Sequence, residues 1–171
     1  MRKISILLAL ILVVAASTAS AQQVLKLGEA APSFSGQGID GTVYDLSQLQ
    51  GKVVVLTFWN TRCAICHSEI PNLNRVAERY RDKDVVFLAV TMDNESKVTP
   101  YLQRNPFHFH IVPNGFGVML KYADRDRAGN INMGFPAHFL IDQKGAIALR
   151  TYGWDKAANL DSQISRLLAS D

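Results

Sequence analysis

The sequence predicts an α/β fold in which a central mixed sheet is flanked by helices, and two observations carry this prediction. Residues 53–59 and 85–91 are almost continuously apolar, as strands are when both faces are buried, and a segment with helical spacing lies between them. This order is that of a parallel strand–helix–strand unit. Residues 137–141 and 146–152 flank a turn over residues 142–145, which predicts an antiparallel hairpin and therefore a mixed sheet.

Residues 1–21 have the pattern of a secretory signal peptide. Two basic residues precede an apolar stretch over residues 4–16, and small residues at positions 19–21 form a cleavage site. The stretch is shorter than the roughly 20 residues that cross a bilayer, so a retained membrane anchor is the less favoured alternative. We expect a periplasmic or otherwise exported protein whose residues 22–171 form a single domain.

The charge of the chain disfavours some classes of partner. Eighteen basic and 15 acidic residues give a net charge of +3, and two of the basic residues, Arg2 and Lys3, lie in the leader. The remaining charges are nearly balanced and no basic cluster stands out, so nucleic acid and anionic membrane surfaces are not expected as partners. We expect a monomer.

A turn-rich stretch opens the predicted domain. Asp40-Gly41 is its strongest hairpin signal, and residues 43–46 would form the returning strand. The sheet is therefore predicted to carry an N-terminal β-hairpin extension.

A helix is predicted from Cys66 onward, because Ile70, Leu73 and Ala77 recur at steps of three and four residues, with a kink at Pro71. The elements expected after residue 91 are a short helix capped at residues 93–96 that Pro100 starts or bends, a strand over 107–112, a helix over 116–122, an exposed loop over 124–132, and a final helix capped by Asp155.

The chain has two cysteines, and both lie in one four-residue segment, Cys63-Ala64-Ile65-Cys66. A disulfide across so short a loop restricts the unfolded chain little, so stability is a poor reason for the pair. A strand ending at Trp59 and a helix beginning near Cys63 place the first thiol at a helix N-terminus, where backbone N–H groups and the helix dipole favour a thiolate. Arg62 adds positive charge, and Cys66 is placed to resolve a mixed disulfide on Cys63.

Three other interpretations of this segment stay open. The pair could be inert, or it could bind zinc with two further ligands, although no histidine has a suitable spacing among His67, His108, His110 and His138. The segment from Cys63 to His67 also satisfies the attachment pattern of c-type haem, with His67 as an axial ligand. Against haem, the motif follows a buried strand, and a second axial ligand would be an arbitrary choice of methionine. Without haem, His67 is expected to be an exposed residue of the first helical turn.

Several motifs resemble those of exported thiol-disulfide oxidoreductases of the TlpA/ResA type. They follow one another along essentially the whole of residues 22–171: Gly28 to Phe34, Asp40-Gly41, Leu46-Ser47, Gly51 to Val55, Phe58-Trp59, Cys63-x-x-Cys66-x-x-Glu69-x-Pro71, Gly134 to Asp142, and Gly145. Any one of these motifs is unspecific, whereas their combination is specific.

The resemblance implies a thioredoxin-like fold with an N-terminal extension, and we expect neither a cofactor nor a metal. It assigns Pro136 as a cis-proline facing the cysteine pair, whereas the residue alone would be interpreted as an ordinary trans proline at a strand edge. A cis bond there would expose the backbone around Phe135 to an extended substrate segment. Glu69 matches an acid of the family motif, which implies proton transfer or tuning of the thiols. The alternative is a solvated glutamate that interacts with the helix dipole.

Two positions depart from the family pattern. Thr57 stands where thioredoxins carry a buried aspartate, so that proton relay is absent and Glu69 is the remaining candidate. Arg62 stands where a tryptophan usually precedes the first cysteine, which changes the substrate groove. We take Arg62, with Phe135 and Pro136, as substrate-binding.

A peroxidase of the peroxiredoxin class would share the N-terminal pattern. It would need a threonine or serine and a proline where this chain has Asn60 and Leu56. Peroxidase activity is therefore not expected.

We therefore expect thiol-disulfide exchange on exported proteins, with Cys63 and Cys66 as the redox-active pair and Glu69 managing protons. The expected partners are exported proteins with cysteines or disulfides, and a membrane thiol-disulfide electron donor or acceptor. Reduction, as in cytochrome c maturation or thiol delivery to metal sites, is favoured over general oxidative folding. A haem-binding electron-transfer protein and a non-catalytic scaffold are the alternatives.

Overall fold

The computed structural model describes residues 24–153 and 157–170. The predicted signal peptide, residues 1–21, lies outside these residues, as does Asp155, the expected cap of the last helix. Within the described residues, no helix is both long enough and apolar enough to cross a membrane.

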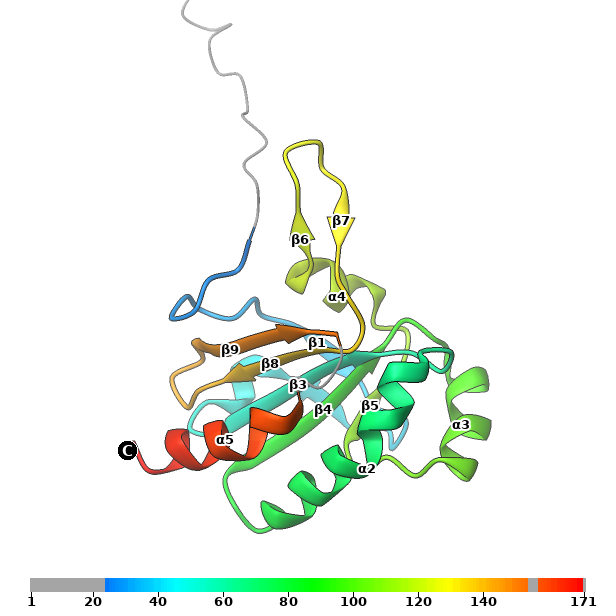
Figure 1. Ribbon diagram of the computed structural model, residues 1–171, viewed down its shortest axis with the longest axis horizontal. Coiled ribbons are helices and arrows are strands. Elements are labelled where there is room, and N and C mark those ends of the chain that lie inside the picture. Colours follow the sequence, from blue (N-terminus) through cyan, green and yellow to red (C-terminus); the bar gives the residue numbers. More distant parts are fainter. Residues whose placement is uncertain (1–23, 154–156, 171) are drawn as a thin grey trace, which may run out of the picture.

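A five-stranded mixed sheet forms the centre of the molecule (Figure 1), in the order β5-β4-β3-β8-β9. Its parallel part consists of β3 (Val53–Trp59), β4 (Val85–Thr91) and β5 (His110–Val112). Strands β8 (Ala137–Ile141) and β9 (Ile147–Tyr152) form a hairpin, and β8 runs antiparallel to β3. The predicted mixed sheet is confirmed.

Helices cover both faces of the sheet because β3 is buried on both sides. Val53, Val55 and Trp59 pack against α2 (Ala64–Arg79) and α5 (Leu160–Leu168), which lie over one face in Figure 1. The same layer includes α3 (Glu95–Arg104) and the short helix η2 (Ala157–Asn159). The alternate residues of β3 pack on the other face against α4 (Phe116–Tyr122) and the N-terminal segment.

The predicted N-terminal hairpin is present as β1 (Ser35–Gln37) and β2 (Val43–Asp45), which pair antiparallel. Strand β2 is one residue shorter than expected, because Leu46 begins the short helix η1 (Leu46–Leu49). The Asp45 side chain caps η1 by accepting a hydrogen bond from the Ser47 amide.

One strand expected in the second half of the chain is shorter than predicted. The strand expected over residues 107–112 contains only residues 110–112, because the Asn74 side chain in α2 donates to the Pro106 carbonyl and accepts from the His108 amide. Helix α3 is capped by Asn94, within the segment predicted to cap it, and of the two alternatives for Pro100 the structure excludes the helix start, because Pro100 lies inside the helix.

The segment 124–132, expected as an exposed loop, is a hairpin of β6 (Asp124–Arg125) and β7 (Ile131–Asn132). The Asp126 carboxylate holds its turn by accepting from the amides of Ala128 and Asn130. The hairpin projects from the body of the molecule (Figure 1) and leads through Met133 and Gly134 into the Phe135–Pro136 bond.

Candidate redox site

Cys63 and Cys66 form a disulfide at the N-terminus of α2. Cys63 is the N-cap residue and has extended backbone angles, and its Sγ accepts a hydrogen bond of 3.1 Å from the Cys66 amide. Cys66 is buried, whereas Cys63 is partly exposed. The sulfur of Cys63 therefore occupies the position where a helix N-terminus favours negative charge.

The loop between β3 and α2 is anchored to the loop that follows β4. One carboxylate oxygen of Asp93 accepts hydrogen bonds from the Thr61 amide, at 2.8 Å, and from the Thr61 hydroxyl, at 2.9 Å. Arg62 is exposed, and its amide donates to the Asn60 side chain. No hydrogen bond or ion pair of the Arg62 guanidinium is found among the described residues.

The Phe135–Pro136 peptide bond is cis, as the resemblance implies. It immediately precedes β8, in which Ala137 lies opposite Phe58 in β3. The cis bond therefore lies beside the end of β3 from which the chain continues to Cys63. Phe135 is half-buried and, like Cys63, packs against the core cluster beneath α2.

Glu69 is a buried residue with 8% relative exposure, not a solvated one. Its Oε2 lies 3.0 Å from Nε2 of His138, which is fully buried in β8. Nδ1 of the same imidazole lies 2.9 Å from the hydroxyl of Thr57 in β3. The three side chains form a continuous buried hydrogen-bonded chain beneath the N-terminal half of α2.

Strand pairing explains how this chain arises. Thr57 and His138 are directly opposite each other in the β3–β8 register. Both point to the face of the sheet that α2 covers, since their neighbours Val55 and Leu140 belong to the core cluster on that face. Glu69 meets them from α2.

The contact between His138 and Glu69 does not follow from the sequence, in which His138 stands out only as a possible zinc ligand. Among the described residues, no three His, Cys, Asp or Glu side chains are grouped as a metal site requires. The alternation along β8 places His138 on the same face as Leu140, but only the register with β3 shows that this face meets Glu69.

His67 is half-buried rather than exposed as expected, because its ring packs on Tyr101 in α3, with 4.7 Å between centroids. Tyr101 in turn packs on Trp59 at the end of β3, and burial raises its pKa. His67 Nε2, Tyr101 Oη and Trp59 Nε1 are all buried without a hydrogen-bond partner among the described residues. Aromatic side chains therefore support this end of α2 from the α3 side.

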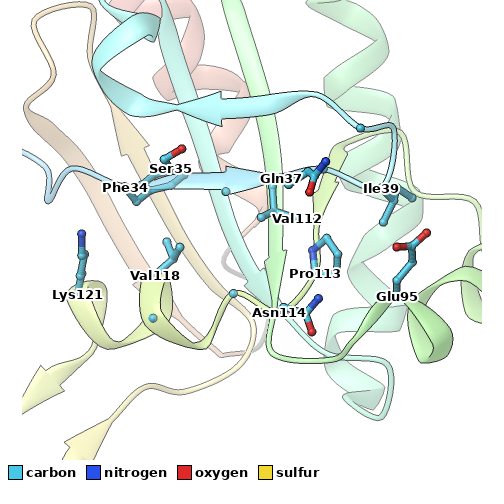
Figure 2. A pocket seen from close by; sticks show the side chains of 15 residues that line it. Phe34, Ser35, Gln37, Ile39, Glu95, Val112, Pro113, Asn114, Val118 and Lys121 are labelled. Carbon is cyan, nitrogen blue, oxygen red and sulfur yellow. The ribbon is translucent and has the colours of Figure 1, made fainter.

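A separate open pocket of about 600 Å³ lies between β1, the loop before α4, and α4 itself (Figure 2). Lys121 and Val118 lie toward one end of it, and Ile39 and Glu95 toward the other. The Lys121 ammonium donates to the Ser33 carbonyl. Neither cysteine lines this pocket, so it is distinct from the disulfide.

The mixed sheet, the disulfide at the start of α2 and the adjacent cis-proline together define a thioredoxin-like thiol-disulfide oxidoreductase. The chain belongs to the AhpC/TSA family, whose model matches residues 27–150.

Comparison with known proteins agrees with this class. The chain is 26% identical over 146 residues to a thiol-disulfide oxidoreductase ResA of Bacillus cereus, covering 84% of this chain and 79% of that protein. It is 30% identical over 124 residues to the thioredoxin-like protein YneN of Bacillus subtilis (strain 168), covering 70% and 68% respectively.

The fold is similar to a crystal structure from Chlorobium tepidum, of a protein described as a thiol:disulfide interchange protein DsbE. The TM-score is 0.68 at 29% identity, covering 84% of this chain and 99% of that chain. The predicted thioredoxin-like fold and the predicted enzyme class are thereby confirmed.

Proposed function

We propose that the protein reduces disulfides of exported proteins through Cys63 and Cys66. The reduced Cys63 attacks one sulfur of a client disulfide as a thiolate, and the client's other sulfur leaves. Cys66 then attacks Cys63, which closes the disulfide found here and releases the second client sulfur. Two electrons pass from the protein to the client, and an external dithiol must restore them.

The observation that carries this proposal is the position of the Cys63 sulfur, which accepts a hydrogen bond from the Cys66 amide at the start of α2. The same hydrogen bond and the helix dipole stabilise a thiolate as attacking or leaving group. Arg62 adds a solvent-exposed positive charge next to it. The cis bond before Pro136, beside the end of β3, provides backbone that an extended client segment can pair with.

We further propose that residues 1–21 are removed on export and that residues 22–171 act as one domain in the periplasm. The relatives named as thiol-disulfide oxidoreductase ResA and thiol:disulfide interchange protein DsbE support the exchange chemistry, and the leader pattern of residues 1–21 supports export. A membrane-bound thiol-disulfide protein would supply or accept the electrons. Cytochrome c maturation and thiol delivery to metal sites are the client pathways that we favour.

Attachment of c-type haem fits the site less well than exchange does. Both sulfurs that would form thioether bonds are joined to each other. The Nε2 atom of His67, the expected axial ligand, is buried, and the ring packs against Tyr101. Peroxidase chemistry fits less well too, because the position that would need a proline is Leu56, an apolar residue in the middle of β3.

Trapping of a mixed disulfide tests the exchange proposal. The reduced Cys66→Ser variant should accumulate a covalent adduct with a disulfide-containing client, because the thiol that would resolve the mixed disulfide is missing. The Cys63→Ser variant is the matched control and should form none. Reduced wild-type protein should also reduce insulin in the presence of dithiothreitol. If Cys66→Ser forms no adduct and the wild type reduces no disulfide, the proposal is wrong.

A further inference from the structure

We propose that His138 is a positioning residue for exchange: supported by Thr57, it holds Glu69 through a hydrogen bond while Glu69 receives the proton of the Cys66 thiol. This inference rests on the proposed function and deepens it. Within the described residues, Glu69 and His138 are the only Asp, Glu, His, Lys or Arg side chains that are buried. A buried carboxylate without a partner is costly, so this pair is stable only as a hydrogen-bonded unit.

Thr57 allows the imidazole to hold either one or two protons. When His138 is neutral with its proton on Nε2, that nitrogen donates to Glu69 and Nδ1 accepts from the Thr57 hydroxyl. When the imidazole is doubly protonated, Nδ1 donates, and the same hydroxyl accepts after rotating its hydrogen. Both protonation states are therefore fully hydrogen-bonded without movement of a heavy atom.

The second carboxylate oxygen of Glu69 is not used by the hydrogen bond to His138. Its Oε1 is buried and has no hydrogen-bond partner among the described residues. Cys66 and Glu69 are three residues apart on α2, so their side chains lie on the same face of the helix. That face is buried, and Cys66 has 2% relative exposure, so solvent has little access to its thiol. Glu69 is then the base on the helix that is best placed for the Cys66 proton.

Resolution starts from the mixed disulfide between Cys63 and a client. The Cys66 thiol gives its proton to Glu69, while His138 continues to donate from Nε2 to the other oxygen of that carboxyl group. The Cys66 thiolate attacks the Cys63 sulfur, and a bond forms between these two sulfurs. The bond from Cys63 to the client breaks, and the client sulfur leaves with the electron pair and takes a proton from water.

Few polar groups face the Glu69–His138 pair, so a change in the pH dependence of the resolving rate can be assigned to these groups. The β3 side contributes Thr57, α2 contributes Cys66 and Glu69, and β8 contributes His138. The surrounding residues of the core cluster are apolar or aromatic. No Lys or Arg of the described residues is buried with them.

The test is the rate of the resolving step as a function of pH. The protein is reduced, a thionitrobenzoate group is placed on Cys63, and its release by Cys66 is followed. His138→Gln keeps a hydrogen-bonding side chain but does not titrate. We expect its rate to be about tenfold lower near pH 6.5, which is less than the roughly hundredfold or larger effect of removing a general base, because Glu69 itself is retained. The difference should become smaller as the pH rises, because hydroxide increasingly replaces Glu69 as the base for the Cys66 thiol.

Three controls separate the outcomes. His108→Gln changes an exposed histidine and should leave the profile unchanged. The folding of each variant is checked by urea denaturation. If His138→Gln does not fold, Thr57→Val replaces it in the test, and its release rate near pH 6.5 should be lowered by a smaller factor. In the reduced wild type, nitrogen-15 spectra of the His138 ring report whether its protonation changes with pH.

An equal reduction of the rate at every pH, or no reduction, would overturn the role of His138. The proposed function would still stand in that case, because wild-type release of the thionitrobenzoate would be intact. If the wild type itself fails to release the group from Cys63, the exchange function fails instead.

Discussion

Asp93 accepts two hydrogen bonds from Thr61, one from its amide and one from its hydroxyl, and so ties the loop before Cys63 to the end of β4. The loop that leads from β3 to the disulfide is thereby fixed to the end of β4. Asp93 itself is oriented by a hydrogen bond from its own amide to the Thr91 hydroxyl.

Replacement of Asp93 by alanine should loosen this loop. Because Asp93 is half-buried and accepts two hydrogen bonds as a charged group, we expect a loss of about 1–3 kcal/mol in the free energy of unfolding. The measurement is urea denaturation of the oxidised protein. Asp93→Asn keeps one acceptor oxygen and should lose less, and equal stability of Asp93→Ala and wild type would contradict the prediction.

Replacement of Arg62 by alanine should slow alkylation of the reduced Cys63 by iodoacetamide at neutral pH. The guanidinium is exposed, so its effect on the thiolate is small, about twofold in rate, as for other exposed charge pairs. High salt should reduce the difference. Arg127→Ala, which changes an exposed arginine in the β6–β7 hairpin, is the matched control and should have the wild-type rate.

Tyr80 joins α2 to α5, because its hydroxyl bonds to Asp161 at 2.9 Å and to Ser165 at 2.6 Å. Tyr80→Phe should lower the free energy of unfolding by about 1 kcal/mol, the usual net contribution of such hydrogen bonds. Tyr101→Phe is the matched control, because the Tyr101 hydroxyl is buried without a hydrogen-bond partner among the described residues. Its removal should leave stability unchanged or improve it. If Tyr80→Phe is as stable as the wild type, the Tyr80 hydrogen bonds do not stabilise the packing of α2 on α5.

The Tyr44 hydroxyl donates to Asp40 at 2.7 Å and lowers the pKa of that carboxyl below its ordinary value of 3.8, with help from the Thr42 amide. A lowered pKa in the folded state contributes stability above the unfolded pKa, and this contribution is lost as the pH falls through the folded pKa. Tyr44→Phe should therefore raise the pKa of Asp40 and weaken the acid dependence of stability below pH 4. NMR titration of the wild type and of Tyr44→Phe measures the pKa of Asp40. Asp45 is the internal reference, because its pKa is lowered by hydrogen bonds from Ser47 and not from Tyr44.

Local sequence patterns correctly predict those elements in which the apolar positions of the sequence are also the buried positions of the structure. Strands 53–59 and 85–91, and helix 116–122, agree with the structure at both ends. The apolar runs are sufficient because these strands are buried on nearly every residue. The cis bond before Pro136 agrees as well, but that expectation comes from the family resemblance.

The remaining differences come from contacts between segments far apart in the chain. Asn74 holds the backbone around residues 106–108 away from the sheet, and no pattern within that segment reveals it. Thr57 by itself indicates only that the aspartate relay of thioredoxins is absent, whereas its strand partner His138 continues the chain to Glu69. Such pairings depend on the register of β3 against β8, which sequence alone does not specify.

The antiparallel position of β8 beside β3 determines when this protein can become active. Because the cysteines follow the end of β3 and Pro136 precedes β8, the disulfide and the cis bond come together only when strands from distant parts of the chain have paired. Under the proposed function, a chain that has not completed its sheet would carry the cysteine segment without the backbone that we propose to bind a client. Its exchange reactions would then lack the client selectivity of the folded protein.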